Sequence, residues 1–167
     1  MIDLEFIPPA YQKYIRWIDD SNIYSLLEKD FRDSSSFFEM IPENKFDYYY
    51  APGKWSIKEV LQHLIDVERV FVYRALRFSR LDPTDLLGFD QELYIETVSL
   101  DNIAFKDILN EWKSLRASTI LFYKNLNPKF LDRNGRAGGH EFSVKSIAYV
   151  LVGHTRHHIS ILKEKYL

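Results

Sequence analysis

Apolar residues recur every three or four positions in four long stretches of this chain, which is the spacing that places side chains on one face of an α-helix. The segments between these stretches contain proline, glycine and asparagine, which interrupt helices. The pattern predicts helices over residues 21–40, 56–80, 101–126 and 143–167. Four helices of about 20 residues joined by long loops predict an all-α four-helix bundle.

Several residues mark the ends of these helices. Pro42 and Pro128 follow the first and third stretches and cannot continue a helix. Ser56 and Glu59 have the spacing of a capping box, in which each side chain binds a free amide of the other residue. Ser143 is placed to begin the last helix.

The remaining segments carry weaker patterns. Residues 1–20 are expected to form an N-terminal arm or a short helix, within a single domain that spans residues 1–167. Residues 94–98 have the composition of a brief strand, although the surrounding segment is irregular. Residues 134–139 are rich in glycine and predict a turn-rich loop.

Composition narrows the possible chemistry. The chain has 167 residues, of which 46% are apolar, so we expect a packed core. It has no cysteine, which excludes disulfides, thiolate metal ligands and a cysteine nucleophile. The net charge of -2 gives no basic field for nucleic acid or an anionic membrane. No apolar run is long enough to cross a membrane, and the acidic start is unlike a signal peptide, so we expect a cytoplasmic protein.

Three of the five histidines lie between residues 154 and 158. At about 100° per residue, His154 and His158 fall within about 20° of Ile147, in the middle of the apolar face of the last helix. His157 falls on the flank of that face, about 80° away, and is expected to be a bystander. A histidine pair four residues apart on one helix can chelate a divalent metal ion.

His63 lies on the shoulder of the apolar face of the second helix, where it can supply a third nitrogen. A single histidine in such a position is more often a hydrogen-bonded core residue than a ligand. Several buried imidazoles together need a common cause, because each unpaired one is costly to desolvate. A bound divalent ion provides that cause.

Two motifs resemble a known family. They are Ala-Pro-Gly-Lys-Trp-Ser-Ile-Lys-Glu-Val-Leu-Gln-His-Leu at residues 51–64 and Gly-His-Thr-Arg-His-His-Ile-Ser-Ile-Leu at residues 153–162. Together they resemble the DinB-like superfamily, in the branch of metal-dependent hydrolases of the YfiT type. The resemblance implies an up-down-down-up bundle, a homodimer, and a zinc or nickel ion held by His63, His154 and His158.

The resemblance also has a departure. Related sequences often carry Tyr-Asp-Glu in the loop after the second helix, where this chain has Phe89, Asp90 and Gln91. If that loop contributes to the site, Asp90 is the remaining candidate for a catalytic role.

Three functions fit these features. Three neutral ligands leave a coordination position for water or substrate, as in catalytic zinc sites. The first function is therefore a hydrolase that uses a metal-activated water on a small-molecule substrate. The second is a low-molecular-weight-thiol S-transferase that uses a metal-bound thiolate. The third is a non-catalytic, stress-related scaffold that binds metal.

Two charged residues near His63 are further catalytic candidates. Asp66 can orient an imidazole or a water molecule, but a solvated helix carboxylate is the simpler interpretation. Arg74 can hold a substrate carboxylate, but a surface ion pair with Glu68 or with an acidic residue of a loop is at least as good an explanation.

The aromatic residues allow similar alternatives. Trp55, Trp112 and Tyr149 can line a pocket, although packing in the core is the more common role for each of them. The run Tyr48-Tyr49-Tyr50 can form a lid or a dimer surface.

Overall fold

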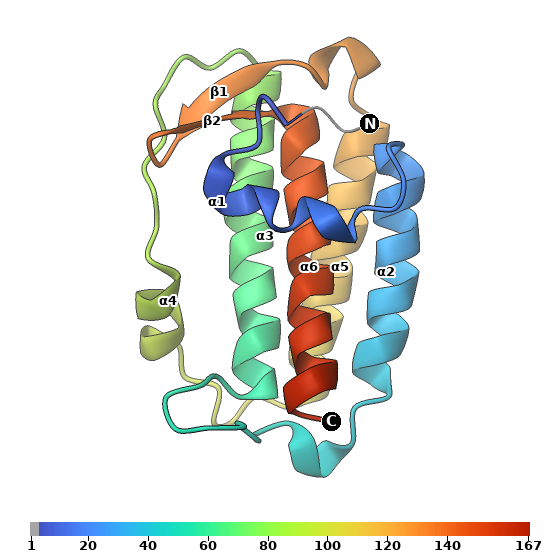
Figure 1. The fold of residues 1–167 in the computed structure, drawn as a ribbon, viewed down its shortest axis with the longest axis vertical. Coiled ribbons are helices and arrows are strands. Elements are labelled where there is room, and N and C mark those ends of the chain that lie inside the picture. Colours follow the sequence, from blue (N-terminus) through green and yellow to red (C-terminus); the bar gives the residue numbers. More distant parts are fainter. Residues whose placement is uncertain (1–3) are drawn as a thin grey trace.

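The computed structural model describes residues 4–167 and shows the four-helix bundle that the sequence predicts (Figure 1). Its long helices are α2 (Ile23–Glu39), α3 (Ile57–Ser79), α5 (Phe105–Lys124) and α6 (Val144–Lys165). The capping box is formed at the start of α3, as the sequence predicts. The helix α5 begins four residues later than expected, because a turn precedes it.

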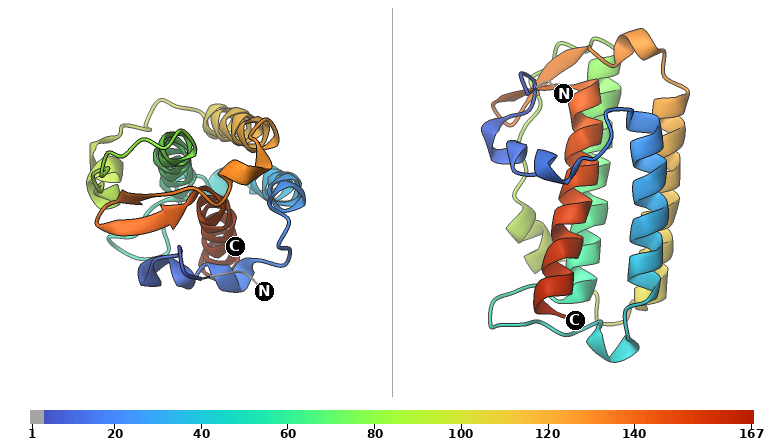
Figure 2. Two further views of the ribbon diagram at one scale, coloured as in Figure 1. Left: turned by 90° about the horizontal axis from the view of Figure 1, so that it is seen from above. Right: turned by 45° about the vertical axis from the view of Figure 1, so that its right-hand side comes forward.

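The helices follow the up-down-down-up order (Figures 1 and 2). Both α3 and α2 pack against α5 and α6, so α3 and α2 lie diagonally opposite each other. Because α3 and α5 run in the same direction, residues 80–104 must return along the whole length of the bundle (Figure 1). None of the described helices is both long and apolar enough to span a membrane.

The returning segment contains the short helix α4 (Gln91–Thr97), so the strand considered for residues 94–98 is wrong. Asp90 explains the difference, because its side chain accepts hydrogen bonds from the amides of Glu92 and Leu93. These bonds satisfy the free amides of the first turn and favour a helix over an extended segment.

The loop expected before α6 is a β-hairpin, formed by β1 (Asn134–Ala137) and β2 (His140–Ser143). Its two-residue turn uses Gly138 and Gly139, whose φ values of 58° and 80° suit glycine. Gly135 lies directly on the ring of Phe78, where any side chain would collide. The hairpin therefore closes the upper end of the bundle (Figure 1).

The N-terminal segment crosses α6 with the short helices α1 (Pro9–Gln12) and η1 (Ile15–Trp17) (Figures 1 and 2). A Cβ atom at Gly153 of α6 would overlap the carbonyl group of Tyr14, so this glycine permits the close crossing. The Arg156 guanidinium also donates a hydrogen bond of 2.6 Å to the carbonyl oxygen of Trp17.

The buried side chains form two apolar clusters, one toward each end of the bundle. On α3, the lower cluster uses positions within 57–65 and the upper cluster uses positions within 67–78. On α6, the upper cluster uses positions within 144–152 and the lower cluster begins at Ile159. The boundary between the clusters is polar.

We call that boundary the polar layer, and it consists of Asp30, Glu68, Arg116, Thr119 and Thr155. The Arg116 Nε atom lies 2.9 Å from both Glu68 carboxylate oxygens, and one Nη atom binds Asp30. The other Nη atom lies 3.1 Å from the Thr155 hydroxyl oxygen, and Thr119 donates to Glu68 at 2.7 Å. The buried charges are therefore paired and hydrogen-bonded.

Candidate metal centre

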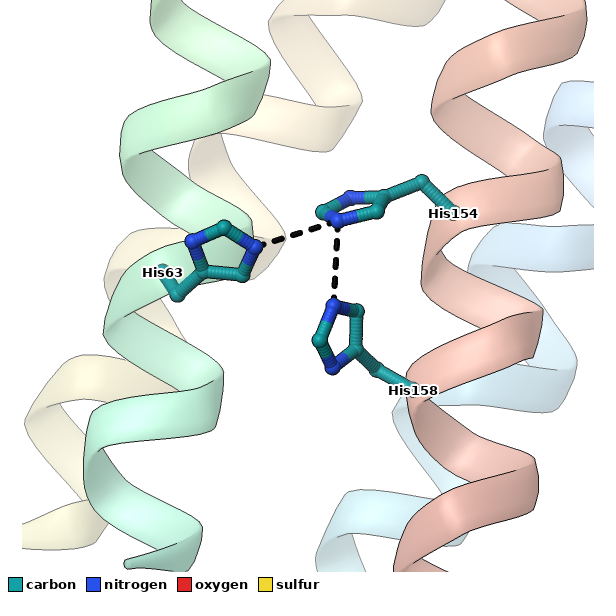
Figure 3. A group of neighbouring side chains, drawn as sticks. All are labelled: His63, His154 and His158. Carbon is teal, nitrogen blue, oxygen red and sulfur yellow. Dashed lines mark hydrogen bonds between the residues drawn. The ribbon is translucent and has the colours of Figure 1, made fainter. Parts of the chain in front are cut away.

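The structure brings His63 of α3 together with His154 and His158 of α6 (Figure 3). The Nε2 atom of His154 lies 3.1 Å from that of His63 and 3.0 Å from that of His158. The ligand atoms of the three residues all lie within 4.8 Å of one another. Helical phase placed His154 and His158 on the inner face, and the neighbouring helix α3 supplies the third ring.

Hydrogen bonding alone does not satisfy this arrangement. The Nε2 atom of a neutral imidazole offers either one proton or one lone pair, so it makes one good hydrogen bond. His154 Nε2 is nevertheless in contact with two other Nε2 atoms. Three imidazole nitrogens around a tetrahedral ion, each at about 2.0–2.1 Å, lie roughly 3.3–3.4 Å apart. The two distances from His154 Nε2, 3.1 Å and 3.0 Å, are close to that value.

Burial keeps the three imidazoles neutral. It lowers the pKa of His63 from 6.5 to about 4. Burial, followed by repulsion from His63, lowers the pKa of His158 to about 3. The pKa of His154 is also well below its usual value, because of burial and then repulsion from His158. Each ring therefore carries a free lone pair at neutral pH, which is the form that binds a metal ion.

Two aromatic rings pack against the cluster and hold it in place. The ring of Trp55 lies 4.7 Å from that of His63, measured between centroids. Trp55 immediately precedes Ser56, the first residue of the capping box that begins α3. On the other side, the ring of Tyr14 lies 5.2 Å from that of His154.

A cavity of about 250 Å³ opens beside His158. Tyr50, Trp55 and Tyr166 form an aromatic wall, with ring centroids of Tyr50 and Tyr166 5.0 Å apart. Glu92 is the one carboxylate among the described residues that line this cavity. His63 and His154 are almost completely buried, so the cluster reaches the cavity through His158.

The structure decides between cavity lining and core packing for Trp55, Trp112 and Tyr149. Trp55 and Tyr50 line the cavity, whereas Tyr49 is exposed outside it. Trp112 is fully buried in the lower apolar cluster. Tyr149 is also a packing residue, since it is buried and its hydroxyl donates to the carbonyl oxygen of Ser21 at 2.7 Å.

Asp66 does not join the histidine cluster. Its carboxylate accepts a 2.9 Å hydrogen bond from Gln62. It interacts electrostatically with Arg69 and with Glu111 of α5, and burial raises its pKa. The pKa of His63 is lowered by burial, with no contribution from Asp66. This position does not suit an orienting role toward the histidines.

Arg74 is buried, but it lies about 16 Å from His63 along the axis of α3. It donates a 3.1 Å hydrogen bond to the carbonyl oxygen of Leu87 and lies over the rings of Phe71 and Phe89. The expected ion pair with Glu68 is wrong, because that carboxylate binds Arg116 in the polar layer. Arg74 thus holds the returning segment against α3.

Asp90 caps α4, and the two residues that follow it, Gln91 and Glu92, line the cavity. Sequence reasoning missed Glu92, because it treated the segment around residue 90 as a loop. It also missed Tyr14 as a wall of the cluster. Gly153 was the available signal for that contact, since a glycine in a helix interior often permits close approach of another backbone.

His157 lies on the flank of α6, as helical phase predicts. Its ring packs against that of Tyr14, with the two ring centroids 5.3 Å apart. It does not belong to the group of converging nitrogens.

Comparisons with known proteins agree with the fold and with the position of the motifs. A family model described as the DinB superfamily matches residues 26–162. The solved structure of YfiT from Bacillus subtilis is similar, with a TM-score of 0.71 and 16% sequence identity. The match covers 98% of this chain and 90% of that chain. YfiT is described as a probable metal-dependent hydrolase with an unusual four-helix bundle topology. No curated protein matches the chain.

Proposed function

Because this chain belongs to the DinB superfamily, we propose that it is a metal-dependent hydrolase whose single divalent ion is held by His63, His154 and His158. The description of YfiT as a probable metal-dependent hydrolase supports the same class. The observation that carries the proposal is the convergence of three neutral imidazole nitrogens beside an open cavity.

The donor set suits zinc or nickel. Imidazole nitrogen is a borderline ligand that both ions accept, and calcium or magnesium would require oxygen ligands instead. No carboxylate belongs to the described ligand group, so the ion would keep its full positive charge. When bound, such an ion lowers the pKa of a water ligand toward about 7 and polarises a substrate oxygen.

The surrounding residues have separate tasks in this proposal. His158 borders the cavity, so substrate approaches from its side of the cluster. The rings of Tyr50, Trp55 and Tyr166 bind the apolar part of a small substrate and exclude water from it. We assign the uptake of a proton to Glu92, because it is the one carboxylate among the described residues that line the cavity.

The open cavity favours an enzyme over a metal-binding scaffold. A structural metal site is closed and uses all of its coordination positions for protein ligands. Here the described ligand group has three members, and one of them borders a cavity of about 250 Å³.

Elemental analysis tests the metal site. We expect one equivalent of zinc or nickel in the purified protein and almost none in His63→Ala or His158→Ala. His157→Ala is the matched control, because that ring lies on the same helix outside the ligand group, and it should retain the metal. A wild-type protein that cannot be loaded with either ion would overturn the site.

Activity measurements then separate the functions. Metal-loaded protein is assayed with ester and amide substrates, and with an electrophile in the presence of a panel of small thiols. Hydrolysis that needs no thiol and disappears in His158→Ala supports the hydrolase. Turnover that requires an added thiol would instead identify an S-transferase. Tight metal binding without turnover in either assay would favour the scaffold.

A further inference from the structure

Arg74 of α3 is the one buried charge among the described residues that has no partner of opposite charge. It is 3% exposed, and the other buried charges, those of Asp30, Glu68 and Arg116, pair with one another in the polar layer. Burial lowers the pKa of the Arg74 guanidinium, and the Tyr11 side chain is the one neighbour that opposes this effect. A buried cation is costly to desolvate unless an anion compensates it.

The surroundings of Arg74 hold its guanidinium in place without satisfying it. The rings of Phe71 and Phe89 flank the guanidinium carbon, with centroids 4.9 Å and 5.7 Å away. These rings attract the charge but offer no lone pair to its N–H groups. One Nη atom donates to the carbonyl oxygen of Leu87, and the Tyr11 hydroxyl also interacts with the guanidinium. Most of the N–H groups of Arg74 therefore have no acceptor among the described residues.

The free donors of Arg74 reach solvent. Four buried side-chain atoms of the described residues lack a hydrogen-bond partner, and none of them belongs to Arg74. Its Nε and Nη1 atoms form no hydrogen bond of standard geometry, so they are absent from that group because they keep accessible surface. An oxygen atom of a ligand is about the size of a water molecule, so it can contact them.

None of the elements around these donors brings a carboxylate to them. The helix α1 packs against α3 through the ring of Tyr11, and the returning segment runs down beside α3 (Figure 1). In that segment Asp85 pairs with an arginine of β1, and Asp90 caps α4. No carboxylate affects the pKa of Arg74. An oxyanion that approaches Arg74 therefore meets no competing anion.

We infer that Arg74 and the hydroxyl of Tyr11 form an oxyanion site on the surface between α3, α1 and the returning segment. The ligand is a phosphate or carboxylate group, either free or at the end of a larger molecule. The guanidinium supplies the charge and the N–H donors, the phenol donates a further hydrogen bond, and the flanking rings limit competition from water. The site lies about 16 Å from His63 along α3 and does not depend on the metal centre.

Thermal melts of the full-length protein test this inference, with inorganic phosphate and acetate compared against chloride at equal ionic strength. At about ten times its dissociation constant, the bound anion should raise the melting temperature by about 3–5 °C. Arg74→Gln should remove this gain. Tyr11→Phe keeps the ring that packs on Phe71 and should weaken binding by about three- to tenfold. A larger gain with phosphate would identify a phosphate ligand, and an equal gain with acetate would identify a carboxylate.

Hydrogen exchange of the wild type locates the site without any variant. Because Arg74 binds the carbonyl oxygen of Leu87, phosphate should slow exchange in residues 86–90 and leave α2 unchanged. Should Arg74→Gln fail to fold, this measurement and Tyr11→Phe decide.

Two control variants complete the test. Arg80→Gln removes an exposed arginine at the end of α3, and His63→Ala removes a proposed metal ligand. Both should keep the gain from phosphate. A gain no larger than that with chloride, a gain that Arg74→Gln retains, a gain that either control loses, or unchanged exchange in residues 86–90 would each overturn the inference.

Discussion

The polar layer and the histidine cluster are both buried polar groups, and they use adjacent residues of α6, Thr155 and His154. In the polar layer, the donors of Arg116 meet oxygen atoms of opposite charge or of a hydroxyl group. In the histidine cluster, three equivalent nitrogens converge with no opposite charge among the described groups. The side chains of the polar layer therefore satisfy one another's hydrogen bonds, whereas the nitrogens of the histidine cluster need a bound partner.

The surroundings of the two groups differ in the same way. Arg116 is completely buried between the two apolar clusters, and no other member of the polar layer is more than 2% exposed. His158 borders an open cavity. Buried polar atoms therefore indicate a functional site when their contacts leave them unsatisfied and a path to solvent exists, and a structural role when neither holds.

The largest effect is expected in the polar layer. Arg116→Met leaves the Glu68 carboxylate buried without a cation and leaves Asp30 with only its 3.3 Å pair to Arg156, so it should lower the free energy of unfolding by about 3–5 kcal/mol. Urea denaturation measures this loss. Arg69→Met, which breaks the exposed pair with Glu111, is the matched control and should cost less than about 1 kcal/mol. Similar losses in the two variants would remove the distinction between the buried and the exposed pair.

The next largest effect concerns the segment that covers the histidine cluster. Gly153→Ala adds a methyl group where the Tyr14 backbone crosses α6, so the N-terminal segment must move away. We expect a net loss of about 1–3 kcal/mol, even though alanine favours a helix by about 1 kcal/mol. Hydrogen exchange in residues 9–18 should be faster in the variant than in the wild type, and exchange in α3 should change less. A variant more stable than the wild type would contradict this close contact.

A smaller effect is expected when one histidine is removed from the metal-free protein. Unlike Arg116→Met, His158→Ala leaves no buried charge behind, because the ring is neutral. The metal-free variant should therefore unfold within about 1 kcal/mol of the metal-free wild type.

The wild type and His158→Ala should differ in stability once metal is added. Zinc or nickel at about 100 times its dissociation constant should stabilise the wild type by about 2.7 kcal/mol, because it binds only the folded state. Thermal melts should show this gain in the wild type and in His157→Ala but not in His158→Ala. Equal stabilisation of all three proteins would place the metal elsewhere.

The smallest effect is expected at Asp66. Its carboxylate binds Gln62 and interacts with residues on the side of α5, so Asp66→Asn should change zinc affinity by less than about twofold. Competition with a chromogenic chelator measures this affinity. A much larger change would restore Asp66 to the role of an orienting residue for His63.

The parts of the fold that the sequence predicts are those with local signals. The capping box at Ser56 and Glu59 fixes the start of α3, and the 100° step per residue places His154 and His158 together. Both signals depend on residues within one helix. Helical phase placed His154 and His158 on one buried face, and the resemblance of residues 51–64 and 153–162 to DinB-like motifs supported His63 as the third member of the cluster.

The missed features depend on contacts between distant segments. Glu68 was matched with Arg74 on its own helix, but the bundle brings it to Arg116, 48 residues away. The hairpin of residues 134–143 contains a glycine pair that reads equally well as an irregular loop. Tyr14 reaches His154 because the N-terminal segment crosses α6, which no local pattern indicates.

X-ray absorption spectroscopy of the zinc- or nickel-loaded protein tests the metal centre most directly. Three imidazole nitrogens at about 2.0–2.1 Å, together with at least one light atom from water, are the expected coordination shell. His158→Ala should lose that shell, and His157→Ala should keep it. A wild-type shell dominated by carboxylate oxygen, or one that His158→Ala leaves unchanged, would contradict the assignment of the three histidines as ligands.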